Sequence, residues 1–118
     1  MTIAAFGTPT SQTASIGTEH FLANVNEAGV YTFHVDMNAL AAGDYLELRI
    51  YQIVLTGGTA RVVYLETFQG GDIAVREEKI FISVPISNEL TDTNSLRFSL
   101  KQTLGTGRSF PWKVLKHS

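Results

Sequence analysis

Apolar and polar residues alternate along most of this chain, and this period of two constrains the fold more than any other feature. Successive side chains of an extended strand point to opposite faces, so an alternating segment buries one face and exposes the other. The alternating segments are 18–25, 29–37, 44–55, 60–69, 78–86, 95–103 and 109–117. We therefore expect about seven or eight strands.

The apolar positions indicate which face of each strand turns toward the core. The expected inward residues are Tyr31, Phe33, Val35 and Met37; Leu46, Leu48 and Ile50; Ile80, Ile82, Val84 and Ile86; Leu96, Phe98 and Leu100; and Phe110, Trp112 and Val114. Segment 60–69 is apolar on both faces, which is typical of a more central strand. Pro85 has no amide hydrogen to donate, so it marks an edge position or the end of pairing.

Turn signals separate these segments at 27–29, 56–59, 69–72, 87–95 and 105–107. Short connections between neighbouring strands make the sheets mostly antiparallel. Only 37–43 favours a helix, a single turn that Gly43 ends. We therefore predict an all-β fold, a two-sheet antiparallel β-sandwich that is jelly-roll-like. The strand order stays open, because an immunoglobulin-like order would give the same pattern.

The first 18 residues are rich in small and hydroxyl side chains, with Ile3 and Phe6 as isolated large apolar groups. Such a segment buries too little surface to hold itself. We expect an extended N-terminal arm at 1–18, which orders on a partner or along a sheet edge. Residues 19–118 then form a single β-sandwich domain, in keeping with a length of 118 residues.

Composition argues against several partners and sites. The net charge is −2 without a block of like charges, so we expect no nucleic-acid partner. No apolar run approaches the roughly 20 residues that a membrane span needs, and we expect neither a membrane partner nor an export signal. Without cysteine the chain has no thiolate metal site or cysteine nucleophile. Only 17% of the residues are charged, which favours a surface that a partner covers.

The glycine-rich segment "LGTGR" at 104–108 raises the question of phosphate binding. A dinucleotide loop requires G-x-G-x-x-G before a helix, and a P-loop requires G-K-[ST]; here a strand follows instead. We interpret the glycines as the turn of a hairpin. The segment therefore predicts a corner of the sandwich and no nucleotide site.

The other candidate constellations also lack catalytic or metal-binding spacing. His34 and Asp36 share a strand face, but no second histidine or serine motif accompanies them. Adjacent carboxylates at 77 and 78 point to opposite faces of a strand. The 89–94 segment lacks the spacing of a calcium loop. We therefore expect no enzymatic activity, no metal and no cofactor.

Aromatic residues leave two interpretations open. Tyr45, Tyr51, Tyr64 and Phe68 could form a platform for sugar rings, as in carbohydrate-binding sandwiches. Tyr51 lies on the outward face of its strand, which favours an interface with a protein or a plain surface role over sugar stacking. Trp112 alternates with Phe110 and Val114, which indicates a place in the core.

Two long segments give the chain a resemblance to a known group. "GVYTFHVDMNALAAGDYLELRIY" and the closing "LRFSLKQTLGTGRSFPWKVLK" are similar to small virion proteins of tailed bacteriophages. The resemblance runs from about residue 17 to the C-terminus. It implies a capsid decoration, or cement, protein that docks on the outer surface of the major capsid shell, with no catalytic residues to carry over.

The resemblance also implies the partners and the location. The partners would be the major capsid protein and other copies of the chain, as a dimer or trimer, with Ile3, Phe6 and Tyr51 as candidate contacts. The protein would be made in the host cytoplasm and lie on the outer capsid surface of the virion. The alternatives are a carbohydrate-binding β-sandwich module and a phage tail or head-fibre component.

Overall fold

The computed structural model describes residues 2–118, within which ten strands and one short helix form. The elements are β1 (Ile3–Ala5), β2 (Thr10–Thr13), β3 (Glu19–Val25), β4 (Gly29–Asp36), β5 (Tyr45–Gln52), β6 (Arg61–Gln69), α1 (Gly70–Ala74), β7 (Ile80–Ile82), β8 (Ile86–Asn88), β9 (Leu96–Leu104) and β10 (Ser109–His117). No helix among these residues is long and apolar enough to cross a membrane.

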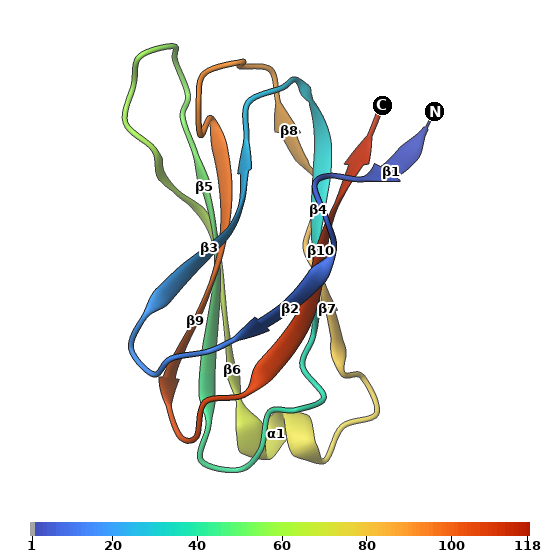
Figure 1. Cartoon of the computed structure of the whole chain (residues 1–118), viewed down its shortest axis with the longest axis vertical. Coiled ribbons are helices and arrows are strands. Elements are labelled where there is room, and N and C mark those ends of the chain that lie inside the picture. The colour runs from blue at the N-terminus through green and yellow to red at the C-terminus, as the bar shows by residue number, and fades with distance from the viewer. Residues whose placement is uncertain (1) are drawn as a thin grey trace.

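Two antiparallel sheets face each other, as expected for a β-sandwich (Figure 1). In sheet A the order is β1 and β2, then β10, β4, and finally β7 and β8; in sheet B it is β3, β9, β5, β6. We count β1 with β2 as one interrupted strand, and β7 with β8 as another, and renumber the strands from 1 to 8 along the chain. The order is then 1-8-3-6 in sheet A and 2-7-4-5 in sheet B. This is the strand order of a jelly roll, so the predicted fold class is confirmed and its topology is now defined.

The core lies between the inner faces of the two sheets. Phe33 of β4 and Phe98 of β9 have no exposed surface, and their ring centroids lie 5.3 Å apart across the sandwich. The inward residues predicted for β4, β5 and β9 are buried as expected, because each lies on the apolar face of an alternating strand. Trp112 is half-buried against this core.

The inward face predicted for 78–86 is wrong at three of its four positions, and only Ile86 packs against the core. Phe81 and Ser83 point inward, whereas Ile80, Ile82 and Val84 are more than half exposed. The Phe81 ring packs edge-on against Phe33 at 6.3 Å, and the Ser83 hydroxyl accepts a hydrogen bond from the Phe33 amide at 2.9 Å. Apolar residues occupy both alternating sets here, so the aromatic ring decides which set is buried.

The predicted central position of 60–69 is also wrong. This segment forms β6, which pairs with β5 alone and lies at the edge of sheet B. Tyr64 and Phe68 turn inward and contact Phe81 of β7, at centroid distances of 6.2 and 5.6 Å. The apolar residues on its other face are exposed. The composition predicted a strand with a neighbouring strand at each edge, but in this topology β6 has only one neighbour, β5.

The helical turn lies at a different place from the one predicted. Residues 37–43 form turns, in which Leu40 donates to the Met37 carbonyl and Asp44 donates to the Ala41 carbonyl. The helix α1 occupies 70–74 instead, where the sequence indicated a turn. A Cβ atom on Gly70 would lie 1.7 Å from the Ala41 carbonyl oxygen, so this close approach requires glycine. Ile73 is fully buried and anchors the helix.

The N-terminal segment is part of sheet A. Its first residue lies outside the described range, but β1 and β2 pair with opposite ends of β10, and Thr2 exchanges two backbone hydrogen bonds with Ser118. Figure 1 accordingly shows both termini side by side. The arm was expected to order either on a partner or along a sheet edge. The structure shows that it lies along the edge of the chain's own sheet A.

Candidate functional site

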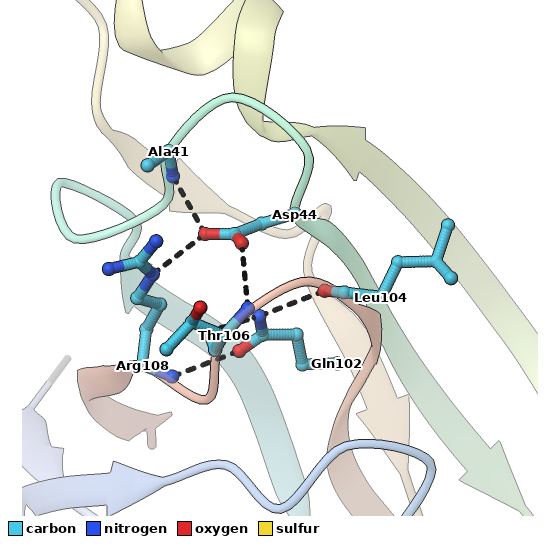
Figure 2. Close-up of polar contacts among 6 residues, drawn as sticks. All are labelled: Ala41, Asp44, Gln102, Leu104, Thr106 and Arg108. Carbon is cyan, nitrogen blue, oxygen red and sulfur yellow. Dashed lines mark hydrogen bonds and ion pairs between the residues drawn. The ribbon is translucent and has the colours of Figure 1, made fainter.

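The glycine-rich loop at 104–108 binds the carboxylate of Asp44, which belongs to the same chain (Figure 2). The Asp44 carboxylate, only 4% exposed, accepts hydrogen bonds from the Ala41 amide at 2.9 Å and the Thr106 amide at 3.2 Å. Arg108 Nε completes the set at 2.8 Å. Burial alone would raise the pKa of Asp44, but these hydrogen bonds outweigh it and hold the pKa below its usual value.

Gln102 satisfies the remaining polar groups of this loop. Its fully buried side chain donates to the carbonyls of Leu104 and Thr106, at 3.0 and 2.7 Å, and accepts from the Arg108 amide at 3.1 Å. A Cβ atom on Gly105 would lie 1.9 Å from the Asp44 carboxylate. The loop is therefore an internal clamp between two turns, and its Thr106 and Arg108 amides are already occupied.

Two of the three histidines come together on the outer surface of sheet A. Thr32 Oγ1 lies 2.9 Å from His34 Nε2 and 3.1 Å from His117 Nε2. Burial lowers the pKa of His34, and the nearby charges of Lys113 and His117 lower it further. No group of three potential metal ligands occurs among the described residues.

The register of β4 against β10 explains this meeting. His34 lies opposite Lys113, and His117 lies opposite Val30 at the far end of the same ladder. Sequence reasoning missed His117 as a neighbour of His34. The signal was present in part, because position 117 falls on the outward set of β10, but the pairing of β10 with β4 could not be derived from alternation.

The outer surface of sheet A, here called the A face, carries several exposed aliphatic side chains. It comprises the outward side chains of β1, β4, β7 and β10, together with Val84. Four aliphatic side chains on it are more than half exposed: Ile3 at 59%, Ile80 at 62%, Ile82 at 59% and Val84 at 52%.

Two hollows mark the A face. One, of about 400 Å³, is lined on its outward side by Ser11, His34, Asp36, Ile80, Pro111 and Lys113. The other, of about 520 Å³, is lined by Val30, Pro85, His117 and Ser118. Because His34 and His117 both contact Thr32, the histidine cluster connects the two hollows. A surface of this kind, apolar with a few polar groups, is suited to contact with another protein.

The outer surface of sheet B, here called the B face, has a different chemistry. Glu19 accepts hydrogen bonds from Tyr51 at 2.7 Å and Ser99 at 2.6 Å, and Arg49 forms an ion pair with Glu47 at 3.0 Å. Burial tends to raise the pKa of Glu19, but the hydrogen bonds from Ser99 and Tyr51 lower it overall. These three charges are paired within the chain, as on a surface that faces water.

The three candidate contact residues do not converge on one surface. Ile3 lies on the A face, opposite His117 in the pairing of β1 with β10. Phe6 packs edge-on against Tyr31, with 5.7 Å between the ring centroids, and so belongs to the core boundary. Tyr51 lies on the B face with its hydroxyl bound to Glu19. The suggested tyrosine platform is also divided, because Tyr64 and Phe68 point inward.

Comparisons with protein-family models, curated proteins and solved structures find no match to this chain. The A face is therefore interpreted from its own residues. It combines exposed aliphatic groups and two open hollows with few charges, a combination suited to an interface.

Proposed function

We propose that the chain is a non-enzymatic virion structural protein, a capsid decoration protein that docks by its A face on the outer surface of the major capsid lattice. The observation that supports this proposal is the set of exposed aliphatic side chains on the A face, contributed by segments far apart in the sequence. The resemblance to small virion proteins of tailed bacteriophages gives the partner.

The exposed aliphatic side chains supply a modest part of the binding energy. Complete burial of an isoleucine or valine side chain contributes about 1.5–3 kcal/mol, and these side chains are already about half-buried, so each adds roughly 1 kcal/mol. The four together contribute about 4 kcal/mol per copy. A protein that binds the assembled shell, and not its dissociated subunits, stabilises the shell by its binding free energy, and this stabilisation is repeated at every occupied lattice position.

The polarity of the two faces supports one orientation on the shell. With the A face against the capsid, the B face points outward, where its paired charges keep the head surface hydrated. Ile3 contributes to docking through β1, which extends the A face beyond β10. Phe6 holds this strand in place by its contact with Tyr31.

A carbohydrate-binding module is the second candidate, and one cluster on the B face favours it. Phe21 is 40% exposed, lies 5.7 Å from the Tyr51 ring and carries the Arg97 guanidinium 3.7 Å above its own ring. Aromatic rings next to polar groups are suited to sugar stacking. Substituting Phe21 with alanine would abolish retardation in a glycan affinity gel if this candidate were correct, and would leave capsid docking unchanged.

The proposal is tested by co-sedimentation with expanded, undecorated bacteriophage heads. The wild-type protein should bind saturably, in a fixed ratio to the capsid subunits. Val84→Lys places a charge on the A face and should abolish binding, while the matched control Val54→Lys, at a 78% exposed position of the β5–β6 connection, should bind like the wild type. Absence of wild-type binding would reject the proposal and direct attention to tail or head-fibre assembly.

A further inference from the structure

The longest open sheet edge in the described part of the chain belongs to β6. This strand has nine residues and pairs with β5 alone. The outermost strands of sheet A have only three or four residues each, and β3, at the other edge of sheet B, has seven. Unpaired backbone groups along an edge attract further strands, so proteins keep such edges short, charged or covered.

The side chains of β6 suit a covered position. Val62, Val63 and Leu65 are 47–49% exposed, and the strand contains neither proline nor lysine, two of the residues by which proteins protect an open edge. Contacts of Tyr64 and Phe68 with Phe81 fix the inner side and hold the edge in a defined geometry.

The arrangement of residues along β6 is self-complementary. The register against β5 skips Val63, so that residue is a bulge. If the bulge is not counted, Val62 and Leu65 are each one position from Tyr64, and both point to the outer side of the sheet. Arg61 and Glu66 are each two positions from Tyr64, and both point to the inner side. An antiparallel pairing of two β6 strands centred on Tyr64 therefore brings opposite charges together twice and apolar side chains together twice.

We propose that β6 pairs with β6 of a second copy across a two-fold axis, so that the two B sheets form one continuous sheet. Each Arg61 then faces Glu66 of the other copy, and each Val62 faces Leu65 of the other copy. Such an interface is isologous and closes with two chains. The dimer does not depend on the capsid proposal, because the edge of sheet B and the A face are different surfaces.

The oligomeric state and the register are tested separately. Sedimentation velocity of the full chain should give a particle of twice the chain mass of 12.9 kDa. The double variant V62C/L65C should form a covalent dimer on mild oxidation, because directly opposite residues have Cα atoms about 4.5–5.5 Å apart, within the range for a disulfide. The native chain contains no cysteine, so the matched single variant V62C, whose opposite residue is still leucine, should remain uncross-linked.

Charge reversal provides a second, independent measurement. R61E places like charges opposite each other and should weaken dimerisation about tenfold, while R61E/E66R exchanges the pair and should restore it. Circular dichroism on each variant confirms that the fold is retained. A monomeric wild-type protein would overturn the proposal, as would a dimer in which V62C/L65C fails to cross-link or in which R61E leaves the dissociation constant unchanged.

Discussion

Replacing Asp44 with alanine should lower the free energy of unfolding by about 4 kcal/mol. Its buried carboxylate accepts three hydrogen bonds, from Ala41, Thr106 and Arg108. Hydrogen bonds to a charged acceptor contribute about 1.5–3 kcal/mol each, and we use the lower end because water can reach the partly exposed Arg108 after truncation. The measurement is the urea midpoint of unfolding at neutral pH, compared between variant and wild type.

The pH dependence of the same site gives a sharper test with Asp44→Asn. Because the folded pKa of Asp44 is lowered from 3.8, its charge stabilises the protein fully above that value. The stabilisation is lost as the pH falls through the folded pKa. The stability difference between wild type and Asp44→Asn should therefore be large at neutral pH and shrink steadily below about pH 4.

The control for this experiment is Asp72→Asn in α1, an exposed carboxylate whose loss should leave the urea midpoint unchanged. Two results would refute the reasoning about the clamp. One is an Asp44→Ala variant within about 1 kcal/mol of the wild type at neutral pH, well below the expected loss. The other is a difference between Asp44→Asn and wild type that stays constant as the carboxylate is protonated.

Three further substitutions test the account elsewhere. Gly105→Ala should destabilise the fold by about 2–4 kcal/mol, because φ is +92° at this position and the added methyl group would collide with the Asp44 carboxylate. The measurement is thermal unfolding, and the matched control is Gly71→Ala, which has open space around it. Phe6→Ala should cost about 2 kcal/mol in urea unfolding through the lost edge-to-face contact, and no loss would show that the N-terminal strands are dispensable. The melting temperature of the wild type should fall between about pH 7 and pH 5, because the lowered pKa of His34 makes the folded protein less stable as the pH falls below 6.5. His34→Gln should reduce this fall, and an equal fall in variant and wild type would contradict the expectation.

Much of the architecture could be predicted from alternation alone. The inward faces of β4, β5 and β9 follow from one apolar residue in every two, because a strand next to a core has only one such solution. The 105–107 turn was also predicted correctly as a corner. Its partner Asp44 was not, since nothing in the sequence links a loop to a carboxylate about sixty residues away.

The errors share a physical cause. In β7 both alternating sets hold apolar residues, so the pattern could not show that Phe81 would be buried and Ile82 exposed. In β6 the composition indicated neighbours on both sides, whereas the strand order of the sandwich supplies only one. The A face depended on which residues of β7 are buried and on the pairing of β4 with β10, so it could not be located from the sequence. Non-local contacts decided each of these outcomes.

Electron cryo-microscopy of bacteriophage heads saturated with the protein tests the central claim most directly. The account predicts density on the outer shell in which β4, β7 and β10 face the capsid protein, with Ile80 and Ile82 in the contact and the B face toward solvent. A bare shell, or an inverted orientation with the B face against the capsid, would contradict it.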